Sequence, residues 1–301
     1  MDVDFMLLQI LDITVPVLLI LSLGSALYIL NIHFDSKTVG ILIVKIATPC
    51  LTFTTLVKTD IALSQLCQSG LAALLVMGLV AAFSFPFIKI QRDRLGPYMS
   101  CLLHPNSGNL PLPLCLLAFG EAGLALAFPY FVVISVSQNT FGYAMISGKL
   151  KWNELLLHPI IISVTAALIV KIVDLPIPEM LIITTSYLGY TAIPLPLLLL
   201  GYALPQISAG NLKKGIIYSF ARLLFGSLAG ICAIYTLGLS GMIAGVIMIM
   251  ACMPVALLNF IIAVERDVEP ETIGGVVIIS SLSMITLIPA LIWLVLWAFP
   301  V

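Results

Sequence analysis

The sequence predicts an all-α, polytopic membrane protein. Of its 301 residues, 61% are hydrophobic and only 9% are charged, and the mean hydropathy is +1.19. Soluble globular chains of this length do not have such a composition. The apolar residues fall into segments of spanning length joined by short connections, which leaves no room for a soluble domain. The formal net charge of −1 does not suggest a nucleic-acid partner.

Ten apolar segments are long enough to be predicted as transmembrane helices. The first follows Asp2 and Asp4 rather than a basic region and has no clear cleavage site, so it is expected to be a retained span and not a signal peptide. The predicted spans are 7–30, 38–57, 66–88, 97–119, 122–146, 155–173, 179–203, 212–237, 240–263 and 272–299.

The basic residues predict the orientation of these spans, because Lys and Arg accumulate in cytoplasmic loops. Alternate loops, counted from the first, carry nine basic residues, and the remaining loops carry two, Lys58 and Lys171. The nine are Lys37, Lys89, Arg92, Arg94, Lys149, Lys151, Lys213, Lys214 and Arg266. The first loop is therefore expected to be cytoplasmic, with both termini outside. The predicted location is the plasma membrane, or the inner membrane if the source is bacterial.

The fourth predicted span is interrupted by the stretch His104–Pro113. Pro111 and Pro113 lack the N–H groups that would bond the carbonyls of Ser107 and Asn109, so the helix must open here. Within a membrane an open backbone is tolerated where it is buried in protein or lines a cavity. Broken helices of this kind form transporter binding sites. A plain proline kink is the alternative interpretation.

The two halves of the chain are predicted to be inverted repeats. Residues 1–150 would hold spans one to five, and residues 151–301 would hold spans six to ten. Because each half has an odd number of spans, the second copy must be inverted in the membrane. Pro49 in the second span corresponds in position to Pro194 in the seventh, and the ninth span carries Pro254 where the fourth is broken. Interrupted segments at matching positions point to a substrate site.

Several motifs resemble those of the auxin efflux carrier family. The stretch Asn106–Pro113, followed by Phe119–Ala125, is similar to the family's fourth-span motif, commonly Asn-x-Gly-x-x-Gly-x-Pro and then a Phe-Gly turn. Pro111 stands where the family commonly has glycine, which stiffens the break. Other stretches similar to the family are Leu157–Pro159, Met253–Ala256, Ala263–Asp267 and Ser280–Pro289.

This resemblance implies a carrier of ten spans in a five-plus-five inverted repeat, with the fourth and ninth helices broken and crossed. It places the chain in the superfamily of bile-acid, arsenite and riboflavin transporters, close to the bacterial malate and malonate permeases. Family substrates are organic anions, among them auxin in plant members. The long central cytoplasmic loop of the plant carriers is absent here.

The residues themselves also favour an anion site. All fourteen Asp and Glu lie in loops or near span ends, whereas a proton or sodium relay needs buried acids. The half-helices that begin after Pro113 and Pro254 would offer free N–H groups and about half a positive charge each. The predicted substrate-binding residues are Asn106, Ser107, Gly108, Asn109, Pro111, Pro113, Pro254, Asn259, Lys45 and Asn139.

Alternative roles stay open for several polar residues. The amide of Asn109 could simply satisfy carbonyls freed by the prolines, and Lys45 could snorkel to the interface instead of meeting substrate. For Arg222 the snorkelling interpretation is favoured, and for His104 a packing role. The matching polar patches Gln138–Thr140 and Ser280–Ser283 could line the pathway or join helices.

The predicted function is secondary transport of a small organic anion, a carboxylate, by alternating access at the crossing. A sodium-coupled symporter of the bile-acid type, or a proton-coupled antiporter, is the alternative. An enzyme is not expected: Ser107 near His104 lacks the surrounding motifs of an intramembrane hydrolase. A receptor would need larger loops. The cysteines lack metal or disulfide spacing, so no metal and no cofactor are expected. The expected partners are the anion and the lipid bilayer, and a homodimer is left open.

Overall fold

The structure, a computed structural model, describes residues 3–148, 159–207 and 210–300, and within these ranges the regular structure is helical. The α-helices are α1 Val3–Ile29, α2 Ser36–Leu42, α3 Thr48–Lys58, α4 Leu63–Gln91, α5 Leu95–Leu103, α6 Pro111–Ser137, α7 Tyr143–Ser147, α9 Pro159–Val173, α10 Glu179–Tyr190, α11 Pro194–Ala203, α12 Leu212–Thr236, α13 Gly241–Ala251, α14 Leu257–Arg266 and α15 Pro270–Ala298. Two π-helical turns, η1 Ile43–Ala47 and η2 Gln138–Gly142, and a 3₁₀ turn, η3 Leu204–Gln206, continue these helices.

Within the described residues, seven helical stretches are long and apolar enough to cross a membrane, so the chain is a polytopic helical membrane protein. The helices α9 and α13 are apolar but shorter. The start of the predicted sixth span, 155–158, which includes His158 of the family-like motif, lies outside the described residues, as do Lys149 and Lys151. The count of ten spans and the inverted repeat stay predictions.

Glycine and proline account for the irregular points inside the long helical stretches. Gly120 has φ 65° and ψ −162°, which divides α6 into two helices at the point where the sequence predicts a boundary between two spans. Pro49 cannot donate to the Lys45 carbonyl, and in the π-turn just before it the Thr48 N–H reaches back to the Ile43 carbonyl. Pro194 begins α11 after a short turn that follows α10.

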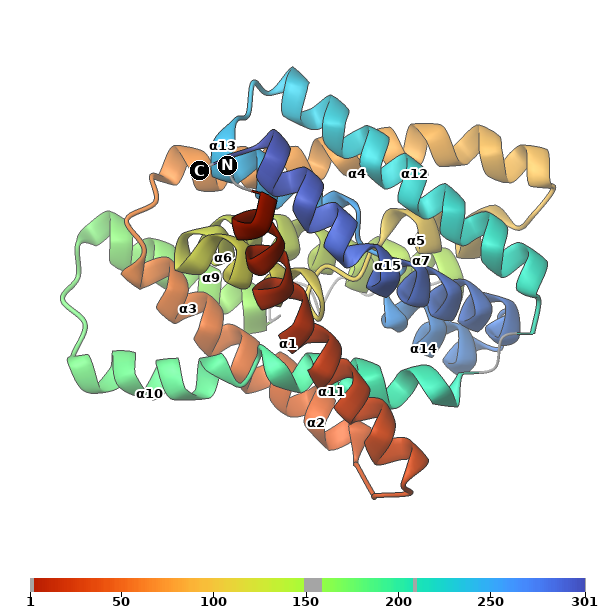
Figure 1. Ribbon diagram of the computed structural model, residues 1–301, viewed down its shortest axis with the longest axis horizontal. Coiled ribbons are helices and arrows are strands. Elements are labelled where there is room, and N and C mark those ends of the chain that lie inside the picture. Colours follow the sequence, from red (N-terminus) through yellow and green to blue (C-terminus); the bar gives the residue numbers. More distant parts are fainter. Residues whose placement is uncertain (1–2, 149–158, 208–209, 301) are drawn as a thin grey trace.

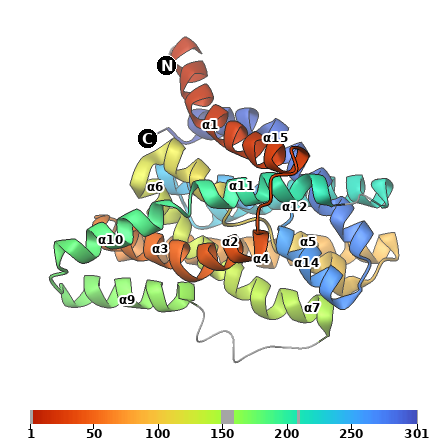
Figure 2. The ribbon, with the colours of Figure 1, turned by 90° about the horizontal axis from the view of Figure 1, so that it is seen from below.

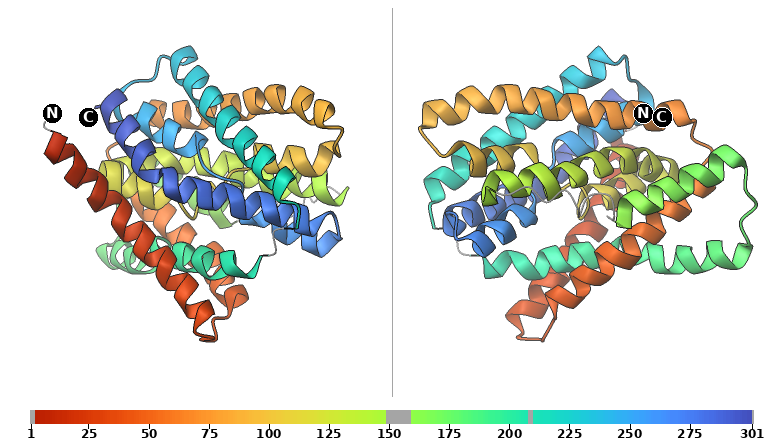
Figure 3. Two further views of the ribbon diagram at one scale, coloured as in Figure 1. Left: turned by 45° about the vertical axis from the view of Figure 1, so that its right-hand side comes forward. Right: turned by 180° about the vertical axis from the view of Figure 1, so that it is seen from behind.

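The connections collect at two ends of the molecule (Figure 1). The loops 92–94 and 267–269 lie at the right-hand end, and the loops 59–62 and 174–178 lie at the left. Views from other directions agree (Figure 3). This separation matches the predicted alternation of loops, while the assignment of one end to the cytoplasm stays a prediction.

A polar cluster joins three of the predicted cytoplasmic segments at that right-hand end. Lys214 forms an ion pair with Asp93 at 2.5 Å, and Tyr218 Oη donates to the other oxygen of the same carboxylate at 2.9 Å. The Tyr98 hydroxyl donates to Glu269 at 2.7 Å, and the rings of Tyr98 and Tyr218 stack. The N-terminal ends of α5, α12 and α15, with the loops before α5 and α15, are thereby held together.

Helices α1 and α11 approach closely through glycine. A Cβ atom on Gly24 would collide with the Leu198 carbonyl, and one on Gly201 would collide with the Leu21 carbonyl. The Ser25 hydroxyl donates to the Gly201 carbonyl at 2.8 Å. Small residues allow such contact between helices in a membrane, where packing and interhelical hydrogen bonds replace the hydrophobic effect.

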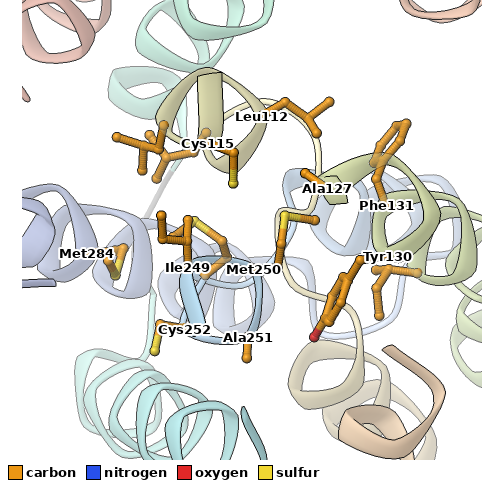
Figure 4. Close-up of a cluster of buried hydrophobic side chains, with 14 of the residues drawn as sticks. Leu112, Cys115, Ala127, Tyr130, Phe131, Ile249, Met250, Ala251, Cys252 and Met284 are labelled. Atoms are coloured by element: carbon orange, nitrogen blue, oxygen red, sulfur yellow. The ribbon is translucent and has the colours of Figure 1, made fainter. Parts of the chain in front are cut away.

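Helix α13 is enclosed by protein on every side. All its residues from Ile243 to Ala251 are buried, which fits its uniformly apolar sequence. Figure 4 shows α13 between Met284 of α15 and the Tyr130–Phe131 side of α6, with Leu112 and Cys115 of the first part of α6 also against it. The segment that follows α13 therefore emerges in the interior of the protein.

Candidate functional site

The fourth and ninth predicted spans are both interrupted, and their open segments pair with each other. Residues 104–110 separate α5 from α6, and residues 252–256 separate α13 from α14. The Asn106 N–H donates to the Pro254 carbonyl at 2.7 Å, and the Ala256 N–H donates to the His104 carbonyl at 3.2 Å. Pro105 and Val255 form an isolated antiparallel bridge between them. The two open segments therefore pair through their main chains, and we call this paired region the crossing.

Asn259 joins both interrupted helices in the interior and has no exposed surface. Its Oδ1 accepts from the Ser100 hydroxyl at 2.7 Å, and its Nδ2 donates to the carbonyls of His104 and Ala256, both at 3.3 Å. The His104 ring is buried too, with Nε2 at 3.0 Å from the Ser137 hydroxyl. Asn259, predicted to contact substrate, therefore has both ends of its amide bonded within the crossing, and His104 has the packing role expected of it.

Arg222 of α12 is also hydrogen-bonded to both broken helices. Its guanidinium donates to the carbonyls of Leu102 at 2.6 Å, Ala251 at 2.7 Å and Met253 at 3.1 Å. The side chain is only 1% exposed. The prediction that Arg222 snorkels to the interface is wrong, because these carbonyls lie in the interior and hold the charged group there.

A cavity of about 310 Å³ lies directly against the crossing. Five of the predicted substrate-binding residues line it: Asn106, Ser107, Gly108, Asn109 and Asn139. Four others do not line it: Pro111, Pro113, Pro254 and Asn259. Other wall residues come from the second, fourth, fifth, sixth, seventh and ninth predicted spans and include Thr48, Gln138, Ile160, Pro196 and Leu257. That any of these residues binds substrate stays a prediction.

The N-terminal ends of α6 and α14 both reach this cavity, but they offer fewer donors than the sequence suggested. The walls include Leu112, Leu257 and Leu258, and among the described residues the backbone N–H groups of these three have no hydrogen-bond acceptor. Pro111 and Pro113 have no N–H to offer. The Asn109 N–H is bonded to the Asn106 side chain at 3.1 Å. The free main-chain donors at the cavity are thus the N–H group of Leu112 at the start of α6 and those of Leu257 and Leu258 at the start of α14.

Gln138 lines the cavity wall, although the sequence pattern places it only in a polar patch that could line the pathway or join helices, and not among the predicted substrate-binding residues. Its side chain is 6% exposed, and its Nε2 has no hydrogen-bond partner within the described residues. Neighbouring Asn139, which was predicted to bind substrate, also lines the cavity, but its amide nitrogen donates to the Ser135 carbonyl at 2.8 Å. Both belong to the π-turn η2, whose register is not readable from sequence. A buried amide without a partner requires an explanation, and a ligand supplies one.

Lys45 lies in a second cavity, of about 520 Å³, which shares Val44, Leu199 and Ile261 with the first. Its wall also includes Lys37 and Gln206, which are next to loops predicted to be cytoplasmic. Lys45 is exposed and has no hydrogen bond or ion pair in the described part of the chain. It is therefore placed on an approach to the first cavity, not on the wall of the first cavity itself.

A helical membrane protein in which the open segments of two broken helices pair beside a cavity has the architecture of a membrane transport protein. Sequence comparisons lead to the same class. A family model described as membrane transport protein matches residues 145–294. The chain is also 22% identical, over 293 residues, to a protein of Methanothermobacter thermautotrophicus named as an uncharacterized transporter, a match covering 92% of this chain and 96% of the relative. Neither description names a substrate.

Proposed function

We propose that this protein is a secondary transporter that carries a small organic anion across the plasma membrane, with both termini outside the cell. The observation that carries the proposal is the meeting of two half-helix N-termini, those of α6 and α14, at one cavity. Each such end is equivalent to about half a positive charge. Together they match roughly one negative charge, that of a single carboxylate.

The side chains on the cavity wall support recognition of an anion that carries little other charge. None of the wall residues, all of which belong to the described ranges, is acidic or basic. Donors are available from the Gln138 amide and from the N–H groups of Leu112 and Leu257. Much of the remaining wall is apolar and includes Ile43, Phe131 and Leu199. A carboxylate with a small apolar body therefore fits better than a polyanion. The absence of wall carboxylates also disfavours the alternative of a proton- or sodium-coupled carrier.

The helix packing supports the proposed inverted repeat, residues 1–150 and 151–301. Helix α3 packs on α9 as α11 packs on α1, and α4 packs on α6 as α12 packs on α15. In a five-plus-five repeat, each of these pairs is the counterpart of the other. Figure 2 shows the α3–α9 pair at the lower left, and α1 with α11 above it. Helices α4 and α12, counterparts of each other, pack together.

The location of the cavity supports alternating access. Helices α1, α3, α9, α10 and α11 pack mainly with one another, as do α4, α5, α6, α12, α13, α14 and α15. The cavity lies between these two groups, because its wall takes Ile160 and Pro196 from the first and Leu112, Phe131 and Leu257 from the second. In transporters with internal repeats, one group moves against the other around the bound substrate.

A thermal-shift series on the purified protein tests the proposal. We expect monocarboxylates with small apolar bodies to raise the Tm saturably, whereas the corresponding uncharged amides leave it unchanged. The stabilisation should grow with the logarithm of ligand concentration above Kd. The best ligand is then tested for saturable uptake into proteoliposomes, in sodium and in choline buffers. Equal stabilisation by the acid and its amide would show that the helix ends do not bind an anion.

A further inference from the structure

The C-terminal ends of the two broken helices meet at one side chain, that of Arg222, and neither of these helix ends lines the cavity. Leu102 is in the last turn of α5 and Ala251 is the last residue of α13. The carbonyls of both accept hydrogen bonds from the Arg222 guanidinium, as does the carbonyl of Met253 in the open segment. In the described part of the chain no carboxylate pairs with Arg222.

Helix dipoles explain how an arginine without a carboxylate is tolerated in the interior. Each helix C-terminus is equivalent to about half a negative charge. The ends of α5 and α13 together therefore amount to about one negative charge, which a single guanidinium neutralises. Without a cation at this point, two unbonded helix ends would face each other in an environment closed to water, where unpaired polar groups are costly.

In other membrane transporters, backbone carbonyls and helix C-termini of this kind bind a cation from solution. Open-segment carbonyls and half-helix C-termini at a crossing are the ligands with which such proteins hold a coupling cation. Here three carbonyl oxygens of that type converge, and the arginine is hydrogen-bonded to all of them.

We propose that the Arg222 guanidinium is a tethered cation that takes the place of a coupling cation at the crossing. The positive charge that a carrier would otherwise draw from solution is built into α12. Arg222 is a positioning residue: it fixes the relative position of α5 and α13 and does not touch the cavity. Binding and transport, in so far as the proposed function holds, then need no sodium ion at this point.

Gly226, one helical turn after Arg222, makes this arrangement sterically feasible. A Cβ atom at Gly226 would collide with the Ala251 carbonyl and would lie 2.9 Å from Nη2 of Arg222. The missing side chain lets α12 approach the end of α13, so that the guanidinium reaches the carbonyls from beside the helix. Arg222 and Gly226, on one face of α12, thus both serve to place the guanidinium at the end of α13.

Chemical rescue tests the proposal without any knowledge of the substrate. The Tm of purified Arg222→Ala is measured in choline, sodium, potassium and millimolar guanidinium chloride, far below denaturing concentrations. We expect the variant to lose several degrees of Tm and to regain a large part of the loss, saturably, with guanidinium or with one alkali cation. Ser219→Ala, on the same helix as Arg222, is the control, because it removes a buried hydrogen bond to the Val276 carbonyl of α15 but no charge, and it should show no rescue.

Two further variants keep the test decisive if Arg222→Ala does not fold. Arg222→Lys retains the charge, and Arg222→Met retains the length without it, so the lysine variant should be clearly the more stable of the two. Equal stability of these variants, absence of rescue in a folded Arg222→Ala, or saturable stabilisation of the unaltered protein by sodium over choline would each overturn the proposal. The Tm readout uses no anion, so its failure is distinguishable from failure of the proposed function.

Discussion

The two interruptions of the crossing pair with each other through their main chains but differ in their side chains. The first, residues 104–110, brings the polar side chains of Asn106, Ser107 and Asn109 to the cavity wall. The second, residues 252–256, has apolar or thiol side chains, all of them buried, and only Ala256 of this segment lines the cavity. The second interruption contributes mainly its main chain.

This difference indicates that the two interruptions have different roles. Under the proposed function, the first interruption supplies side chains for recognition. The second supplies a fixed frame: the Val255 N–H donates to the Ser280 hydroxyl at 3.2 Å, while the Pro254 carbonyl accepts from Asn106 and the Met253 carbonyl from Arg222. Residues that hold the frame should therefore affect stability first, and residues on the cavity wall should affect binding first.

The largest effect is expected for Asn259→Leu. The substitution keeps the volume but removes the hydrogen bonds with Ser100, His104 and Ala256. At about 1 kcal/mol for each bond, the protein should lose roughly 2–3 kcal/mol of stability. The measurement is Tm in detergent. Asn139→Leu is the matched control, because its amide nitrogen bonds a carbonyl of its own helix. If the Asn259→Leu variant were as stable as the unaltered protein, this amide would not support the crossing.

A smaller effect, on binding alone, is expected for Gln138→Leu. Loss of a donor to a carboxylate weakens binding by about 1.5–3 kcal/mol, which is roughly ten- to a hundredfold in Kd. Stability should stay equal or rise, since a buried amide nitrogen without a partner is removed. The measurement is the concentration dependence of the ligand-induced Tm shift. Gln138→Glu, similar in shape but acidic, should weaken anion binding further. Unchanged affinity in both variants would place the anion elsewhere.

The smallest effect is expected for Lys45→Gln. Lys45 is exposed on the second cavity, so it acts on an approaching anion through solvent, and salt screens such an effect. Uptake at low ionic strength should fall by roughly two- to fivefold, as expected for an exposed charge, with no change in Tm. Lys58→Gln, at the opposite end of the molecule, is the control for a change of net charge. A complete loss of uptake would mean that Lys45 contacts the substrate directly.

The sequence predicted the interruptions because proline and glycine act through the local backbone. Prolines fixed the position of the break before α6, and Gly120 lies at the predicted span boundary. Asn259 and Arg222 were interpreted less well, since burial and partners depend on segments far away in the chain. Arg222 bonds the Leu102 carbonyl across 120 residues, and no local pattern reveals such a contact. For Gln138 the sequence left open whether it lines the pathway or joins helices, because neighbours on a helix differ in the direction they face and the π-turn changes that direction.

The close contact of α1 with α11 has a consequence for how the chain assembles. Ser25 and its acceptor, the Gly201 carbonyl, are 176 residues apart. During synthesis the N-terminal part emerges first. The face of α1 that carries Gly24 and Ser25 therefore has no partner until α11, 176 residues further along the chain, has been inserted. Contacts at such a sequence distance form late and slowly. During biogenesis this face of α1 is therefore exposed to wrong partners until α11 docks on it.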